Sequence, residues 1–182
     1  MGLLRLSMNH PLAFFSDKLR KPLFLAFFTG TVILFAVFRP LGEPLTTSAA
    51  PSGIVSFELA CTPTNAQTMI DSWDTHARLY AAFGLGFDFL FMPIYALTLS
   101  FASLLAAGRH PGWFANLGAW MGYCSFVAAI FDGVENIGLW NSLLGHAESV
   151  WPAISFWCAT VKFSVILLGI LYGVIGWLWP KK

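Results

Sequence analysis

Four long apolar stretches limit what this chain can fold into more than any other feature of its sequence. They cover approximately residues 22–38, 77–107, 113–140 and 150–179. A helix of about 20 residues crosses the hydrocarbon layer of a bilayer, whereas a barrel strand needs only about 10 residues of alternating polarity. The stretches are too long for such strands and do not alternate. The sequence therefore predicts an all-α membrane fold: a bundle of four transmembrane helices forming one domain over residues 1–182.

Composition agrees with a membrane location. Hydrophobic residues make up 57% of the chain and charged residues only 10%, which is too apolar for an ordinary soluble domain. Membrane lipids are therefore the expected partners. A net charge of +1 gives no reason to expect a nucleic-acid partner. A larger membrane complex or a homo-oligomer stays open as an alternative partner.

The basic residues predict how the helices are oriented. If the N-terminus lies inside, seven Lys and Arg residues fall on the inner side and two on the outer side. The inner ones are Arg5, Lys18, Arg20, Lys21, Arg109, Lys181 and Lys182, and the outer ones are Arg39 and Arg78. By the positive-inside rule, both termini are cytoplasmic. We expect an integral protein of a bacterial inner membrane.

Two stretches outside the predicted spans have recognisable character. Residues 39–76 form the sizeable outer segment, which begins as a Pro- and Ser-rich loop. Thr62 followed by Pro63 predicts the start of a short helix over residues 63–73 at the outer interface. Residues 1–21 mix apolar and basic side chains, which is typical of a segment lying along the inner membrane surface.

The third span contains polar residues that are costly in a membrane. Asp132, Glu135 and Asn136 are spaced so that they share one helix face. A charged side chain near the centre of a span costs about 2.5 to 3.5 kcal/mol, so such residues usually face the bundle interior and have partners. Small residues continue the same face toward residue 118, and small residues allow close helix packing. We expect this face to pack against the other helices.

Charges of three spans fall at similar depth. At about 1.5 Å per residue, Asp88 and Lys162 lie roughly 15 Å below the outer ends of their helices, and Asp132 roughly 12 Å. Glu135 lies roughly 7 Å deep, nearer the outer mouth. We expect Lys162 to pair with Asp88 or Asp132 and Glu135 to remain free of that pair. The candidate ligand-binding residues are Asp88, Asp132, Glu135, Asn136, Lys162, Tyr95 and Glu58.

No cofactor is expected from the sequence. The three cysteines form no C-x-x-C pair, which disfavours a thiol oxidoreductase. The four histidines lie outside the spans or at their ends, so they do not offer an axial haem pair. Zinc spacing, a phosphate-binding loop and a nucleophile motif are also missing from the sequence. No metal ligand and no catalytic residue is assigned.

Three short segments resemble a group of bacterial four-span membrane proteins with no assigned activity. They are Phe-Glu-Leu-Ala at residues 57–60, Asp-Phe-Leu-Phe at residues 88–91 and Asp-x-x-Glu-Asn at residues 132–136. The resemblance covers approximately residues 54–140. It implies a four-helix fold and carries no activity with it.

Several functions fit these features. The leading hypothesis is an intramembrane acidic site, open to the outer side, that binds an amphiphile, a lipid head group, a cation or a proton, because Lys162 can neutralise only one acid. One alternative is an accessory or assembly subunit of a larger membrane complex. Another is an acid/base enzyme acting on a lipid, such as an isomerase. The charges could instead form a purely structural network.

Overall fold

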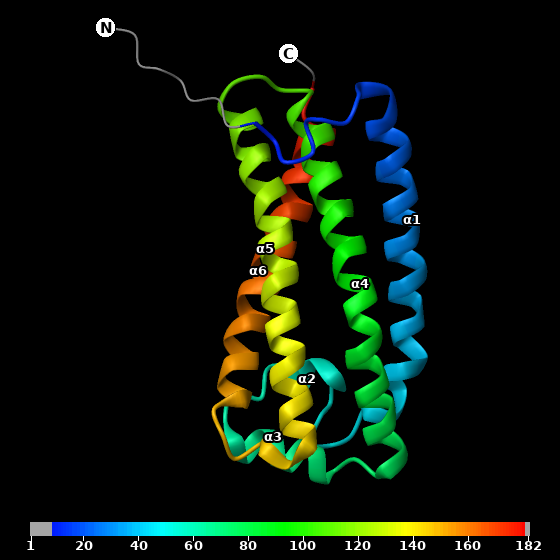
Figure 1. The fold of residues 1–182 in the computed structure, drawn as a ribbon, viewed down its shortest axis with the longest axis vertical. Coiled ribbons are helices and arrows are strands. Elements are labelled where there is room, and N and C mark those ends of the chain that lie inside the picture. The colour runs from blue at the N-terminus through cyan, green and yellow to red at the C-terminus, as the bar shows by residue number, and fades with distance from the viewer. Residues whose placement is uncertain (1–8, 181–182) are drawn as a thin grey trace, which may run out of the picture.

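The computed structural model describes residues 9–180, and these residues fold into helices without a strand. The long helices are α1 (Asp17–Gly42), α4 (Thr75–Ala107), α5 (Trp113–Asn141) and α6 (Trp151–Leu178). Each is long and apolar enough to cross a membrane. Figure 1 shows them side by side as a bundle. The predicted all-α four-helix fold is confirmed, and the predicted spans lie within a few residues of these helices, apart from span one, which α1 extends at both ends.

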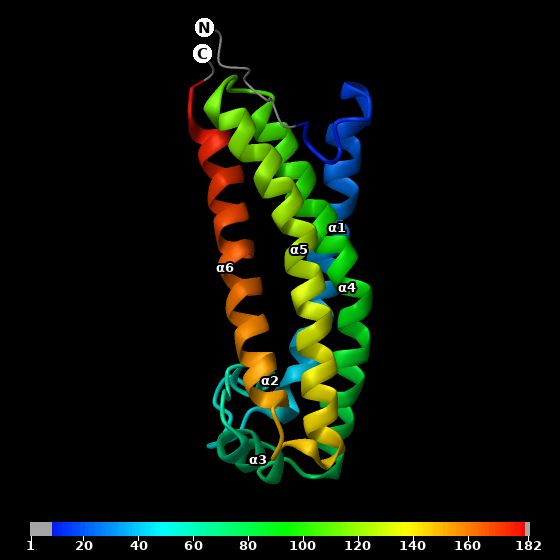
Figure 2. The ribbon, with the colours of Figure 1, turned by 60° about the vertical axis from the view of Figure 1, so that its left-hand side comes forward.

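Helix α4 is the central element of the bundle. It packs against α1, α5 and α6, and α5 packs in turn against α6. Helix α1 packs chiefly against α4 and contains no buried residue. In Figure 1, α1 stands on the side of α4 away from α5, and in the view of Figure 2 α5 lies between α6 on the left and α4 on the right. Both α1 and α6 therefore contact α4, but they do not pack closely on each other.

Small residues allow α5 to approach its neighbours. Gly118, Gly122, Ser125 and Ala128 are buried on the same face of α5 as the polar residues, as predicted. A Cβ atom at Gly138 would overlap the Ser155 hydroxyl of α6. The small-residue face is thus the contact that lets α6 come close to the polar part of α5.

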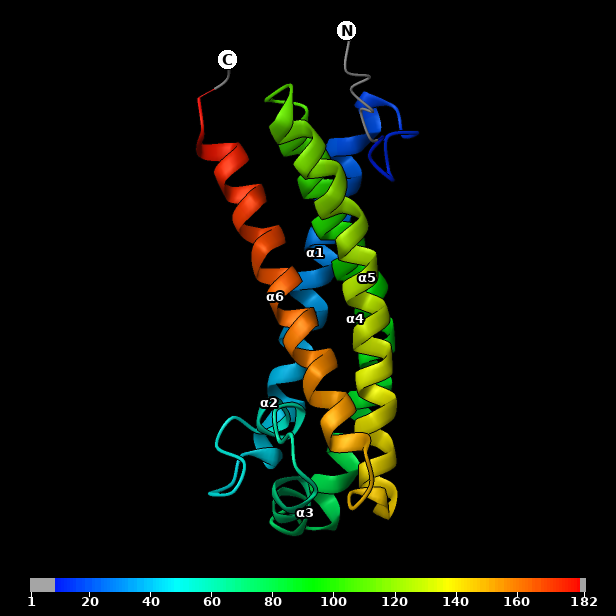
Figure 3. The same cartoon turned by 90° about the vertical axis from the view of Figure 1, so that its left-hand side faces the viewer.

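The segment between α1 and α4 folds into a cap over one end of the bundle. It contains η1 (Glu43–Leu45), α2 (Ile54–Glu58) and α3 (Pro63–Asp71), and η2 (Ser142–His146) lies at the same end. The Thr62 side chain accepts a hydrogen bond from Asn65 N at 3.3 Å, which begins α3 as predicted. The Trp73 indole donates to Leu45 O at 2.8 Å and packs edge-on against Phe57. Figure 3 shows α2 and α3 gathered where α6 begins.

Residues 9–16 lie against the end of the bundle. His10 and Leu12 are buried there, whereas Phe14 is 77% exposed. The predicted position along the inner membrane surface stays a prediction. His10 Nε2 lies 3.0 Å from Ser103 Oγ, and Leu12 N donates to His10 Nδ1 at 3.1 Å. Gly122 provides the space, since a Cβ there would overlap the His10 ring. Residues 1–8 of the predicted surface segment lie outside the described residues.

Candidate functional site

Lys162 is the centre of a buried polar cluster. Its ammonium donates to Glu135 Oε1 at 2.8 Å and to Asp132 Oδ1 at 3.1 Å. Glu58 Oε2 of α2 lies 3.7 Å from the same nitrogen. All four side chains are buried. The cluster therefore joins α5, α6 and the cap, and the expected pair of Lys162 with Asp132 is confirmed.

Two further hydrogen bonds connect α4 to this cluster. The Tyr95 hydroxyl donates to Asp132 Oδ2 at 2.9 Å. Asn136 Nδ2 donates to Asp88 Oδ2 at 2.8 Å, and Leu85 O lies 3.4 Å from the same nitrogen. Asp88 is only partly buried and forms no ion pair within the described part of the chain. Asp88 is thus held by a neutral amide and not by a cation.

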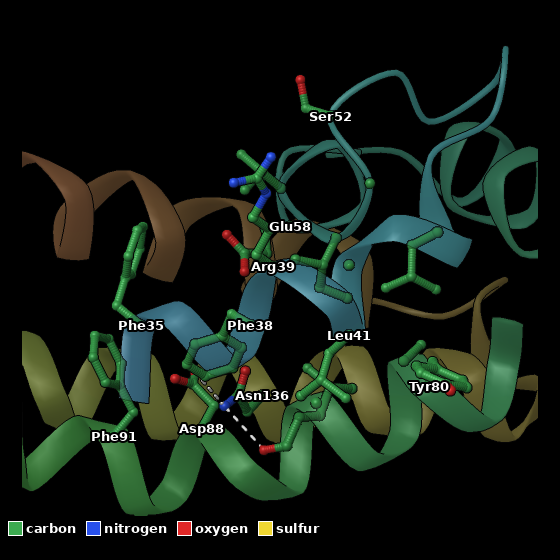
Figure 4. A pocket seen from close by; sticks show the side chains of 18 of the residues that line it. Phe35, Phe38, Arg39, Leu41, Ser52, Glu58, Tyr80, Asp88, Phe91 and Asn136 are labelled. Carbon is green, nitrogen blue, oxygen red and sulfur yellow. Dashed lines mark hydrogen bonds between the residues drawn. The ribbon is translucent and has the colours of Figure 1, made fainter. Parts of the chain in front are cut away.

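A cavity of about 810 Å³ lies beside the cluster, between α1, α2, α4 and α6. Figure 4 shows Asp88 and Asn136 on one side of it and Ser52 of the cap on the other. Beside the cluster, the polar lining comes from Glu58, Asp88, Tyr95, Asp132, Asn136 and Lys162, and nearer the cap it comes from Arg39, Glu43, Thr46 and Ser52. The aromatic lining also includes Phe35, Phe38, Tyr80, Phe91 and Phe163. The cavity therefore has mostly apolar walls, and its charged side, here called the floor, is formed by Glu58, Asp88, Asp132 and Lys162.

The cavity opens between α1 and α6. Phe35 of α1 and Phe163 of α6 both line it, yet they are 68% and 39% exposed. The Arg39 and Ser52 side chains, also exposed, line it near the cap. Because α1 and α6 do not pack closely on each other, the opening faces the side that a bilayer would surround. Toward the other end of the bundle, Met92, Ala96 and Leu99 pack with Phe126 and Ile166 and close the interior.

The cluster contains more acid than base. Four carboxyl groups, those of Glu58, Asp88, Asp132 and Glu135, accompany the single ammonium of Lys162. Lys162 makes its short contacts with Asp132 and Glu135, which lie on the α5 side. Glu58 and Asp88 face the cavity without a close cation of their own. The carboxyl groups that Lys162 does not contact closely are therefore on the cavity side.

Glu58 is the one acid of the set outside the spanning helices. Burial raises the pKa of its carboxyl above the ordinary range, and the opposing effect of the Lys162 ammonium is smaller. The neighbouring Asp132 adds to the rise in this pKa. Glu58 Oε2 is buried and has no hydrogen-bond partner. This oxygen is thus balanced only by the Lys162 ammonium at 3.7 Å.

The structure corrects the position of Glu135. It was expected near the outer mouth, outside the lysine pair, but it is fully buried, does not line the cavity and makes the shortest contact with Lys162. Depth along α5 gave the wrong answer because the cap and the start of α6 cover this end. The Ser155 hydroxyl of α6 donates to the backbone carbonyl of Glu135 at 3.1 Å, which holds the start of α6 against this part of α5. The other six candidate residues line the cavity.

Sequence reasoning missed the aromatic walls and Arg39. Phe35, Phe38 and Arg39 come from α1, which carried no intramembrane charge to draw attention to it. One feature of the sequence could have pointed to Arg39: it is one of only two basic residues on the predicted outer side, where the positive-inside rule expects few. Within residues 9–180, no group of His, Cys, Asp and Glu side chains is arranged to hold a metal ion.

Fold and site together define the class: an integral membrane protein built as a four-helix bundle, with a buried charged cluster beside a cavity. Comparison of the chain with protein-family models, with curated proteins and with solved structures gives no match. The resemblance to bacterial four-span proteins therefore stays a prediction, and the function must be argued from the site.

Proposed function

We propose that this protein binds an amphiphile whose polar head lies against Glu58 and Asp88 and whose apolar part extends between α1 and α6. The observation that carries the proposal is the cavity, which combines apolar walls, a charged floor and an opening toward the bilayer. A molecule with a polar and an apolar end matches that division. We place the protein in a bacterial inner membrane, with the cavity in the outer half of the bilayer.

The size of the cavity supports an amphiphile over a bare ion. Small-molecule sites typically enclose about 300 to 1,000 Å³ and combine apolar walls with a few placed polar groups. A cavity of about 810 Å³ is within that range. A bound proton or metal ion would need only the floor, and it would leave the aromatic walls without a role. The packed residues around Leu99 separate the floor from the opposite end of the bundle, so the arrangement favours binding over conduction.

One observation favours acid/base chemistry on the bound molecule as a second candidate. Two carboxyl groups, Glu58 and Asp88, face the same cavity from different helices, and Glu58 holds its proton more tightly than an ordinary carboxyl. General acid–base catalysis uses a protonated and an ionised group on either side of the reacting atoms. The two candidates differ in whether the bound molecule is released unchanged.

Two glycines of α4 give a matched test of the binding proposal. Gly84 lines the cavity, whereas Gly86 does not, and a Cβ at either position meets no atom within 4 Å. Gly84→Leu should place a side chain in the cavity and obstruct a ligand there, and Gly86→Leu makes the same helix change at an exposed position. Each protein is purified in a neutral detergent, and its bound lipids are extracted, identified by mass spectrometry and counted per protein.

We expect the parent and Gly86→Leu to retain one amphiphile species that Gly84→Leu loses. Recovery of equal amounts from Gly84→Leu would contradict binding in this cavity, as would the absence of any retained species from the parent. If the parent releases a chemically altered form of an added amphiphile and Gly84→Leu does not, the acid/base candidate replaces simple binding.

A further inference from the structure

We propose that the head group bound in this cavity carries a positively charged nitrogen, as a protonated amine or a quaternary ammonium. This inference rests on the proposed function and adds the charge of the ligand to it. It follows from two features of the site. Lys162 contacts the carboxyl groups of α5 more closely than those facing the cavity, and aromatic rings surround the carboxyl groups that face the cavity.

On the α5 side the ammonium of Lys162 is satisfied, although Glu135 Oε2 is buried there without a hydrogen bond. Lys162 donates two short hydrogen bonds there, to Asp132 at 3.1 Å and to Glu135 at 2.8 Å. Tyr95 satisfies the second oxygen of Asp132. The ammonium of Lys162 is thus already engaged by two carboxylates, and its contact with Glu58 is longer, at 3.7 Å.

The carboxyl groups of Glu58 and Asp88 face the cavity. Asp88 receives one hydrogen bond, from the Asn136 amide, and lacks a cationic partner among the described residues. Glu58 is only 8% exposed, and its Oε2 atom has no hydrogen bond. Four ionised carboxyl groups beside one ammonium would leave three negative charges unbalanced, and burial opposes this by raising the pKa of Glu58. A positively charged ligand at the cavity would stabilise the ionised forms of Glu58 and Asp88, which no cation of the described chain contacts closely.

The walls suit the same ligand. Phe38 and Phe91 pack edge to face at 5.3 Å and line the cavity together with Tyr80 and Phe163. Aromatic faces attract ammonium groups, and combined acid and aromatic surroundings are the usual recognition of quaternary nitrogen. Lys162 shows that a ring here accepts such a group, since its nitrogen lies 4.6 Å from the centre of the Phe163 ring.

The residues at the rim of the cavity, near the cap, bear on which cationic ligands fit. Arg39 and Glu43 both line the cavity near the cap, so the rim adds no net negative charge. Arg39 forms no ion pair within the described part of the chain. A cationic nitrogen at the floor can therefore belong to a simple amine amphiphile, or to a phospholipid whose phosphate lies toward Arg39.

The test compares head groups on one chain length. Dodecyltrimethylammonium, dodecylphosphocholine, dodecanoate and a neutral dodecyl glycol ether are titrated, each at low mole fraction, into the protein in neutral maltoside micelles. Affinity is measured by calorimetry for the parent, Glu58→Gln, Asp88→Asn, Gly84→Leu and Glu148→Gln. Glu148 is exposed and does not line the cavity, so Glu148→Gln is the matched control for the loss of a carboxyl.

We expect the two probes with a cationic nitrogen to bind at least about tenfold more tightly than the other two, a difference of about 1.4 kcal/mol, because a quaternary nitrogen is attracted by carboxylates and aromatic faces without needing an N–H group. Asp88→Asn and Glu58→Gln should each remove most of that preference, and Glu148→Gln should keep it. Tighter binding of the phosphocholine than of the ammonium points to a phospholipid, and the reverse order points to a single-charge amine.

Equal affinity for all four probes, abolished by Gly84→Leu, would overturn the cationic head group and leave the proposed function standing. Stronger binding of dodecanoate would also overturn it. If Gly84→Leu binds every probe as the parent does, the cavity is not the site and both proposals fail. A preference that survives in Asp88→Asn and in Glu58→Gln would assign the cation to other residues and overturn the inference.

Discussion

At the scale of single residues, Lys162 determines how the buried charges are arranged. It holds Asp132 and Glu135 against α6, and by doing so it leaves Glu58 and Asp88 directed at the cavity. Removing one partner of a buried ion pair usually costs more than the pair contributes, because the remaining charge is left without compensation. The stability of the bundle and the character of its cavity therefore both depend on this lysine.

Lys162→Met should destabilise the protein by about 3 to 5 kcal/mol, because it leaves buried carboxylates without a cation. Glu135→Gln should cost less, about 1 to 3 kcal/mol, because Asp132 still pairs with Lys162 and the amide oxygen can accept the same hydrogen bond. Thermal unfolding in detergent compares both variants with the parent. Lys18→Met, at an exposed lysine of α1, is the control. A Lys162→Met protein as stable as Lys18→Met would show that the cluster does not need its ammonium.

At the scale of elements, the segment before α1 closes the end of the bundle opposite the cap. Leu12 N–H donates to His10 Nδ1, so the neutral ring carries its proton on Nε2 and donates to Ser103, whose hydroxyl donates to Ser100 O at 2.8 Å. Burial, together with the smaller effect of the positive charge of Arg20, lowers the pKa of His10 to about 4. This element is therefore adapted to a neutral imidazole.

The sign of the resulting pH dependence follows from that lowered pKa. Between about pH 6.5, the ordinary histidine value, and about pH 4, the unfolded chain binds more protons at His10 than the folded chain. Stability from His10 should be complete above that window and be lost as the pH falls through it. Thermal unfolding from pH 7.5 to 4.5 is measured for the parent and His10→Gln. The difference between the two should shrink toward low pH, and a constant difference would contradict the neutral buried ring.

At the scale of the whole molecule, four spanning helices place both described ends of the chain together and the cap at the opposite end (Figure 1). The positive-inside rule assigns the cap to the outer side. That assignment matters for function, because the cavity opens beside the cap and would draw its ligand from the outer half of the bilayer.

Cys61 tests the orientation. It lies in the cap and is partly exposed, whereas Cys158 is buried and Cys124 lies within α5. A membrane-impermeant thiol reagent added to intact cells should label the parent at Cys61, and Cys61→Ser should lose that label. Labelling of the parent only after the cells are lysed would place the cap inside and reverse the orientation.

The sequence alone determined the four helices and limited the partner of Lys162 to Asp88 or Asp132, of which the structure shows Asp132. Both depend on local properties: a helix that crosses a bilayer needs a long apolar run, and the rise per residue sets the depth of each charge. The spacing of Asp132 and Asn136 with small residues also fixed which face of α5 points inward.

Only the tertiary structure decided the position of Glu135 and the existence of the cavity. Depth along one helix does not say what covers that helix, and the cap together with the start of α6 buries Glu135. The cavity depends on α1 packing against α4 without closing on α6, and on α2 folding back so that Glu58 meets Lys162. These are contacts between elements far apart in the chain, and no periodicity within one element encodes them.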